Sequence, residues 1–179
     1  MSDKPRIATV SLCGCFGCHM SLLDIDERIL DLVGLVTFDR TPLTDIKRLG
    51  DCDLGLIEGG VANAENVEVL REFRRRCKVL VAFGACAVNG GVPAMRNQFR
   101  LADCLRESYC DGIGVHNPGI PNDPEIPLLL NQVHPVHEVV EIDHFLPGCP
   151  PSADAIWTFL NELLEGKPIR LPYDQLHYD

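Results

Sequence analysis

The sequence predicts one α/β domain, residues 1–179, built on a doubly wound and mostly parallel sheet of the flavodoxin-like type. Short apolar runs alternate with amphipathic helical patterns along the chain. The runs are rich in Val, Ile, Leu and Ala and end at Gly or Cys, which is typical of strands buried on both faces of a parallel sheet. A length of 179 residues suits a single domain, and the sequence has no internal repeat.

Five apolar runs are expected to form the strands of this sheet. Each is short and bounded by turn or helix signals, as buried parallel strands are. The expected strands are residues 6–12, 34–38, 53–57, 78–83 and 138–142.

Three helices are expected around these strands. Ser21 can cap a helix that carries an apolar stripe and stops at Gly34. Residues 63–76 form a second helix with a charged, solvent-facing side. The last helix begins after a cap at Ser152, has one apolar face and ends at Gly166.

Residues 114–127 contain four prolines and no period, so they are expected to form a long loop. Loops of this length inside a compact domain are usually functional or lie at an interface. We therefore expect this Pro-rich loop to serve contacts with another chain.

Composition and charge exclude several classes of protein. Apolar residues make up 46% of the chain and charged residues 23%, which are ordinary globular values. The formal net charge of −10 argues against nucleic acid as a partner, because phosphate binding needs a basic surface. The apolar runs are too short to cross a membrane. Residues 1–5 carry neither an apolar export segment nor a twin-arginine pair, so a cytoplasmic protein is expected.

Nine cysteines are many for 179 residues, and in a reducing compartment they indicate metal or redox chemistry before disulfides. Cys15 and Cys18 follow the first expected strand, Cys86 follows the central one and Cys149 follows the last. Because the carboxyl ends of parallel strands meet at one edge of a sheet, these four cysteines are expected to converge.

The residues around these four cysteines favour an iron-sulfur cluster. Glycines next to them let the backbone approach sulfur closely, and expected helix starts direct free N–H groups toward the thiolates. A redox-active C-x-x-C pair would leave Cys86 and Cys149 unexplained. A structural zinc site usually takes two close cysteine pairs, whereas Cys86 and Cys149 each stand alone.

Other candidate residues lie close to these motifs or elsewhere among the cysteines. Cys13 could replace Cys15 as a ligand, because Cys13, Cys15 and Cys18 lie within six residues. His19 and Glu58 are candidates for hydrogen bonding close to the cluster, and Glu58 alternatively caps a helix or loop. Small buried side chains are the simplest interpretation of Cys52, Cys77 and Cys104, and Cys110 has no assigned role.

Taken together, these motifs resemble the small subunits of nickel-iron hydrogenases, and the resemblance covers most of the chain. Pro-Gly-Cys-Pro-Pro also occurs in the related cluster-bearing subunit of quinone-linked respiratory NADH dehydrogenase. That relative typically has adjacent cysteines at its first motif, whereas this chain has C-x-x-C. The motifs that carry the resemblance are residues 15–21 (CFGCHMS) with Asp24, residues 57–60 (IEGG), residues 84–87 (GACA) and residues 147–152 (PGCPPS).

The resemblance is to the cytoplasmic NAD-reducing subtype, because no export signal is seen in residues 1–5 and the residues after Pro151 contain no cysteine. It implies that Cys15, Cys18, Cys86 and Cys149 bind one 4Fe-4S cluster. It also implies a large partner subunit that holds the nickel-iron centre, and diaphorase subunits with flavin and further iron-sulfur clusters that reduce NAD. FMN at the sheet edge of this chain is left open, because no flavodoxin-like phosphate loop is evident.

Overall fold

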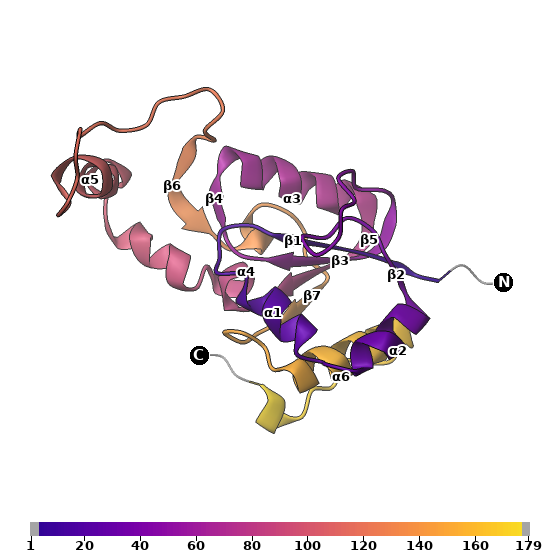
Figure 1. Cartoon of the computed structure of the whole chain (residues 1–179). Helices are drawn as coiled ribbons and strands as arrows, with labels where there is room; N and C mark the ends of the chain where they lie inside the picture. The colour runs from indigo at the N-terminus through magenta and orange to yellow at the C-terminus, as the bar shows by residue number, and fades with distance from the viewer. Residues whose placement is uncertain (1–3, 177–179) are drawn as a thin grey trace.

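The computed structural model describes residues 4–176 and has a five-stranded parallel sheet at its centre (Figure 1). Its strand order is β2-β1-β3-β5-β7, with every neighbouring pair parallel. Counted along the chain, this is the 2-1-3-4-5 order of flavodoxin-like folds, so the predicted fold class is confirmed. The strands are β1 Arg6–Ser11, β2 Thr37–Phe38, β3 Cys52–Glu58, β5 Cys77–Phe83 and β7 His144–Leu146.

Helices cover both faces of this sheet. On one face, Leu22, Leu32 and Phe159 share a core with alternate residues of the strands. On the other, Leu70 and Phe73 pack over the opposite side chains. Figure 1 shows α3 on one side and α1, α2 and α6 on the other. The helices are α1 Gly17–Leu23, α2 Arg28–Leu35, α3 Ala64–Arg76, α4 Ala85–Asn89 and α6 Ala153–Leu164.

A projecting arm, residues 92–134, leaves the sheet after α4 (Figure 1). Residues 112–128 have only turns and bends, so the Pro-rich loop predicted at 114–127 is confirmed as a loop. The arm returns through a strand that pairs antiparallel with a short strand beside the main sheet. Its elements are the 3-10 helix Val92–Gln98, α5 Leu101–Arg106, the π-helix Glu107–Asp111 and β6 Leu129–His134, which pairs with β4 Val61–Asn63.

The prediction of one helix from Ser21 to Gly34 is wrong. Two helices replace it, because the chain turns at Asp26, whose φ of 54° lies in the left-handed region. Ser21 lies inside α1, and Gly34 lies inside α2. Leu22, Ile25 and Leu32 of the apolar stripe are buried, whereas Val33 is 51% exposed, and the stripe continues across the turn without marking it.

Two strand predictions also need correction. Residues 138–142 do not form the last strand, which is β7 at His144–Leu146. The apolar side chains of residues 139, 140 and 142 instead pack against the core from a loop. Asp143 accepts a hydrogen bond from the Leu80 amide at 2.7 Å just before β7 begins. Of the expected strand at 34–38, only Thr37–Phe38 pairs with β1.

Within residues 4–176, no helix is long and apolar enough to cross a membrane.

The cap of α3 offers a test of the fold away from the cysteines. The Asn63 side chain accepts a hydrogen bond from the Asn66 amide at 2.7 Å. We expect Asn63→Ala to lower the free energy of unfolding by about 1 kcal/mol, because a helix-terminal N–H loses its acceptor. Asn63→Asp keeps an acceptor and should cost less than half as much. Urea unfolding would measure both, and equal losses would contradict a capping role.

Candidate metal centre

The four predicted cysteines line one cavity at the carboxyl edge of the sheet. Cys15 follows β1, Cys18 lies in the first turn of α1, Cys86 lies in α4, and Cys149 precedes α6. Cys15 and Cys149 are exposed, whereas Cys18 is buried. The structure therefore brings together residues from three separate parts of the sequence. The cavity is lined by Cys15, Gly17, Cys18, Glu58, Ala85, Cys86, Gly148, Cys149 and Pro150.

Glycines leave room for the sulfur atoms around this cavity. A Cβ on Gly84 would collide with Cys18 Sγ, and the φ of Gly84, 87°, is unfavourable for other residues. A Cβ on Gly17 would lie 3.1 Å from Cys15 Sγ, and one on Gly91 would lie 2.9 Å from Cys86 Sγ. At Gly84 and Gly91 only glycine permits the backbone to come so close to a thiol, whereas at Gly17 a side chain would require a small shift of Cys15 Sγ.

The thiols are close enough to affect one another electrostatically. Burial raises the pKa of Cys18 well above its ordinary value, and the charges of Glu58, Cys86 and Cys15 raise it further. Burial also raises the pKa of Cys86, to which Cys149 and Cys15 add, while a hydrogen bond from the Val92 amide lowers it. Four negative thiolates in such a site need positive charge between them, which metal ions supply.

A buried network of polar side chains lies directly behind Cys18. The Cys18 amide donates to Glu58 Oε1 at 3.1 Å, and the other carboxylate oxygen contacts His19 Nδ1. His19 Nε2 lies 2.8 Å from the Thr9 hydroxyl. His19 is 0% exposed and Glu58 2% exposed. Because buried polar groups need partners, the network fixes α1 against β1 and β3.

Phe16 holds an unusual backbone conformation at the start of α1. Its φ of 67° is left-handed, which is uncommon for a non-glycine residue. Its ring stacks on His19 with centroids 4.7 Å apart and an interplanar angle of 2°. The backbone therefore turns sharply between Cys15 and Cys18, which places both thiols toward the cavity.

Hydrogen bonds also hold the loop that carries Cys149. The Ser21 hydroxyl donates to the Pro151 carbonyl at 2.5 Å, and the Ala85 amide donates to the Gly148 carbonyl at 2.8 Å. These bonds tie the loop to α1 and α4, which carry two of the other cysteines.

Sequence reasoning named most of the residues at this site but missed some. It identified His19 and Glu58 near the cysteines without their contacts. It gave no role to Thr9, whose only signal is a hydroxyl within an apolar strand, or to the Val92 amide, which no sequence pattern marks. Cys13, the alternative to Cys15, pairs through its backbone with Gly60 and does not line the cavity.

The donor set fits a cluster better than a single ion. Among residues 4–176, no three His, Cys, Asp or Glu side chains are placed to hold one metal ion. In a four-iron cluster each thiolate binds a different iron, so the four sulfurs stand farther apart than around one ion. The four cysteines and the glycines behind them are therefore compatible with an iron-sulfur cluster.

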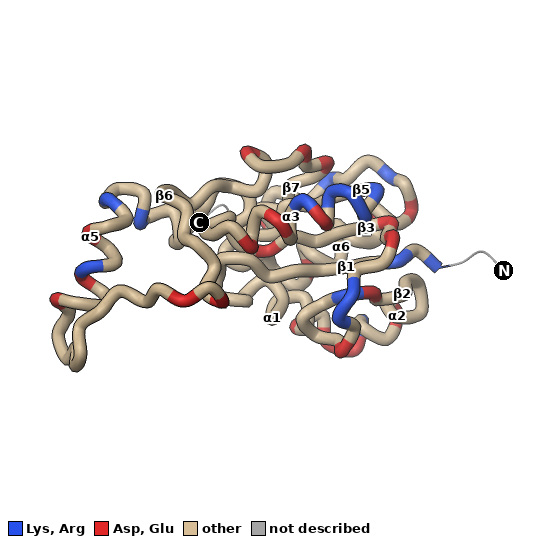
Figure 2. Tube along the Cα trace, turned by 90° about the horizontal axis from the view of Figure 1, so that it is seen from above, with Lys and Arg blue, Asp and Glu red and all other residues tan. Residues whose placement is uncertain are grey.

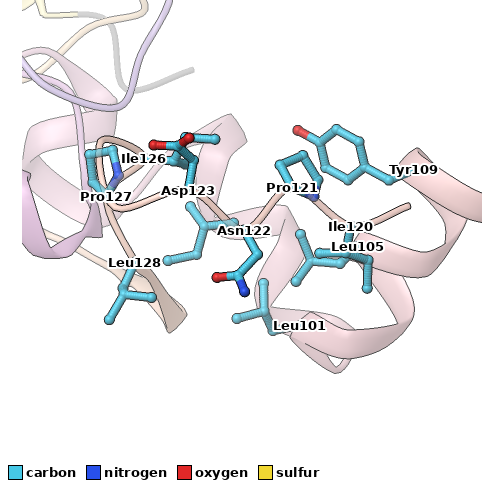
Figure 3. Close-up of a pocket in the computed structure, with 11 residues that line it drawn as sticks. Leu101, Leu105, Tyr109, Ile120, Pro121, Asn122, Asp123, Ile126, Pro127 and Leu128 are labelled. Atoms are coloured by element: carbon cyan, nitrogen blue, oxygen red, sulfur yellow. The ribbon is translucent and has the colours of Figure 1, made fainter. Parts of the chain in front are cut away.

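A larger pocket lies away from these cysteines, in the projecting arm (Figure 3). Leu101, Leu105 and Tyr109 of the helices face Ile120 and Pro121 of the Pro-rich loop across it. Its volume is about 340 Å³ and its lining is mostly apolar. The pocket contains no group of titratable residues that would suit a reaction.

Comparison with known proteins gives one family match and several relatives. The family model described as "NADH ubiquinone oxidoreductase, 20 Kd subunit" matches residues 15–163. The subunit delta of the NAD-reducing hydrogenase HoxS from Cupriavidus necator is 50% identical, over 98% of this chain and 86% of that protein. A subunit of the F420-non-reducing hydrogenase vhu from Methanococcus voltae is 38% identical over 96% of this chain, which spans only 60% of that protein.

Solved structures agree with the sequence relatives. A chain of an NAD+-reducing NiFe-hydrogenase in the H2-reduced state is 59% identical, with a TM-score of 0.96. The match covers 98% of this chain and 99% of that one. A NiFeSe-hydrogenase of Dm. baculatum, 18% identical with a TM-score of 0.62 over 97% of this chain and 69% of its own, supports the fold alone.

The burial of Cys18 predicts an order of reactivity among the thiols. In the metal-free chain, iodoacetamide should modify Cys15 and Cys149 at least about tenfold faster than Cys18, because a raised pKa leaves less reactive thiolate. Peptide mapping by mass spectrometry would give the three rates. In urea, where burial is lost, the rates should converge. Equal rates in the folded chain would contradict the described burial of Cys18.

Proposed function

We propose that this chain transfers electrons within an NAD-reducing hydrogenase. The chain belongs to the family of the 20 kDa subunit of NADH ubiquinone oxidoreductase, and a relative at 50% identity is a subunit of an NAD-reducing hydrogenase. This chain is the small subunit, and it passes electrons from hydrogen toward NAD. The observation that carries this proposal is the convergence of Cys15, Cys18, Cys86 and Cys149 on one cavity.

We assign these four thiolates as ligands of one 4Fe-4S cluster. When bound, the cluster accepts and releases single electrons. The chain's own residues hold the thiolates at fixed positions, and Gly17, Gly84 and Gly91 keep the backbone close to sulfur. The Val92 amide lowers the pKa of Cys86, and backbone N–H groups beside cluster sulfurs tune cluster potentials.

Glu58 and His19 act as positioning residues for Cys18. The carboxylate of Glu58 holds the Cys18 amide, and His19 holds that carboxylate in turn. His19 is itself fixed by Thr9 and by stacking on Phe16. The chain thereby sets the place of one ligand through contacts on β1, β3 and α1.

Partner chains supply the remaining chemistry. A large subunit holds the nickel-iron centre, and diaphorase subunits with flavin and iron-sulfur clusters reduce NAD in the cytoplasm. The large subunit covers the carboxyl edge of the sheet, where Cys15 and Cys149 are exposed. The projecting arm extends this contact surface, because it starts beside Cys86 and exposes apolar side chains. These are Val92, Met95, Phe99, Tyr109, Ile113, Ile120, Ile126, Leu128 and Leu129.

Two other functions remain to be separated by experiment. A quinone-linked dehydrogenase subunit is disfavoured by the C-x-x-C spacing of Cys15 and Cys18. A zinc-binding module is disfavoured because no three suitable side chains within residues 4–176 can hold one ion. Metal analysis of the native complex distinguishes all three: iron with nickel supports the hydrogenase, iron without nickel the dehydrogenase, and about one zinc per chain the binding module.

Substitution of a ligand should remove the cluster. In Cys86→Ser, we expect loss of most of the iron bound by this subunit, because a hydroxyl is a poor substitute for a thiolate. Cys104→Ser is the matched control, since Cys104 lies in α5, outside the cavity. Iron would be measured per chain after anaerobic purification of the complex. Full iron content in Cys86→Ser would remove that residue from the ligand set.

The glycines that lie against the cysteine sulfurs, Gly17, Gly84 and Gly91, give an independent test that changes no ligand. Gly84→Ala should reduce cluster content by at least about half, because its methyl group would collide with Cys18 Sγ at a backbone φ of 87°. Gly34→Ala is the control: nothing lies within 4 Å of its added methyl, and in a helix alanine is favoured over glycine by about 1 kcal/mol. The visible absorbance of the cluster would measure its content in both variants. Unchanged absorbance in Gly84→Ala would contradict the claim that Gly84 leaves the space that Cys18 Sγ needs.

A further inference from the structure

Two cysteines outside the proposed cluster form a pair at the opposite end of the sheet. Cys52 opens β3 and Cys77 opens β5, and the parallel ladder places them directly opposite each other. The cavity of the other cysteines lies where β3 ends, at Glu58. The pair therefore stands apart from the candidate metal centre, and its chemistry is independent of the proposed function.

Both side chains belong to the core beneath α3. Cys52 is 2% exposed and Cys77 4% exposed. A Cβ on Gly55 would lie 2.9 Å from Cys77 Sγ, so this sulfur leans toward β3. Each thiol affects the pKa of the other. Neighbouring strands lie about 4.8 Å apart, within the Cα separation of about 4.4–6.8 Å that a disulfide spans.

A basic hollow opens over the two cysteines. Its volume is about 740 Å³, and both cysteines contribute to its lining. Arg76 pairs with Asp51, Lys78 with Asp53 and Arg6 with Asp39, so Lys4 and Arg75 supply the excess positive charge of the hollow, although the whole chain has a net charge of −10. Figure 2 shows Lys and Arg gathered where α3 ends and β5 begins. The charged residues of the hollow are Lys4, Arg6, Arg75, Arg76 and Lys78, with Asp51 and Asp53.

We propose that Cys52 and Cys77 form a redox-active dithiol, which a small anionic disulfide of the glutathione type oxidises to an intramolecular disulfide. The register of the strands, which sets Cys52 opposite Cys77, and the burial of both side chains in one core supply the geometry. The basic hollow supplies the preference for an anionic reagent, since positive potential raises the local concentration of anions.

The reaction is thiol-disulfide exchange in two steps. The thiolate of one cysteine attacks the small disulfide, which forms a mixed disulfide and releases one small thiolate. The thiolate of the other cysteine then attacks the protein sulfur of the mixed disulfide, which closes the Cys52–Cys77 bond and releases the second small thiolate. The two cysteine sulfurs give up two electrons to the small disulfide, and their two protons pass to the released thiols.

Burial also sets how readily the pair reacts. It raises the pKa of Cys52 to about 11 and that of Cys77 to about 12. Near neutral pH both cysteines therefore remain thiols, and exchange is slow. The disulfide would join β3 to β5, the two strands whose far ends lead to Glu58 and Cys86. Because exchange is slow, the disulfide forms during a long exposure to oxidant and not during a brief one.

Peptide mapping of the purified complex tests the proposal. The complex is incubated anaerobically with oxidised glutathione, blocked with iodoacetamide and digested with trypsin. We expect peptide 49–71 joined to peptide 77–78 in at least roughly half of the chains, lost again on treatment with dithiothreitol. Cys52→Ser should abolish the linked peptide, while Cys104→Ser should leave it unchanged. At low salt, the neutral reagent hydroxyethyl disulfide should oxidise the pair several-fold more slowly than oxidised glutathione does. The difference between the two rates should shrink as salt is raised.

Recovery of both cysteines as alkylated thiols after denaturation would overturn the proposal. So would glutathione adducts at Cys52 or Cys77 without the linked peptide, because they would show that the second step does not occur. Equal rates with the neutral and the anionic disulfide would contradict the part assigned to the hollow. None of these outcomes depends on hydrogen oxidation, so the test stands or falls separately from the proposed function.

Discussion

The rest of the structure depends on one constraint: the strands of the main sheet run parallel and deliver their carboxyl ends to the same edge. The segments that follow β1, β5 and β7 each bring cysteines to that edge, although Cys18, Cys86 and Cys149 are more than sixty residues apart from one to the next. A shift in strand order would separate them. The geometry of the candidate centre is therefore a property of the whole sheet, and the apolar cores on its two faces hold that geometry in place.

Polar groups buried at this edge give the site its rigidity. Glu58, His19 and Thr9 satisfy one another's hydrogen bonds behind Cys18, so that burial leaves none of the three without a partner. The loss of any one would leave a buried partner unsatisfied and free α1 to move. The bond from Ser21 to the Pro151 carbonyl extends the same anchoring to the loop of Cys149.

Much of this arrangement could be predicted from the sequence, because period and cysteine placement are local signals. The flavodoxin-like class, the helices at 64–76 and 153–164, the cap at Ser152 and the long loop all follow from such patterns. What failed was what local patterns do not contain. The turn at Asp26 breaks an apolar stripe that continues across it, and residues 138–142 are apolar because a loop packs on the core. The role of Thr9 depends on a contact with His19 across the fold, which spacing does not reveal.

The central claim is that electrons leave the hydrogen-splitting partner through the four cysteines of this chain. The most direct test is the Cys149→Ser complex, in which two activities are measured on the same sample. One is the exchange of deuterium gas (D2) with water protons, and the other is hydrogen-driven NAD reduction. Exchange needs only the nickel-iron centre of the partner, whereas NAD reduction needs the path through this chain. The account predicts that exchange persists while NAD reduction falls at least about a hundredfold, the loss expected when an obligatory step is removed. NAD reduction at the normal rate in a complex shown to lack this cluster would contradict it.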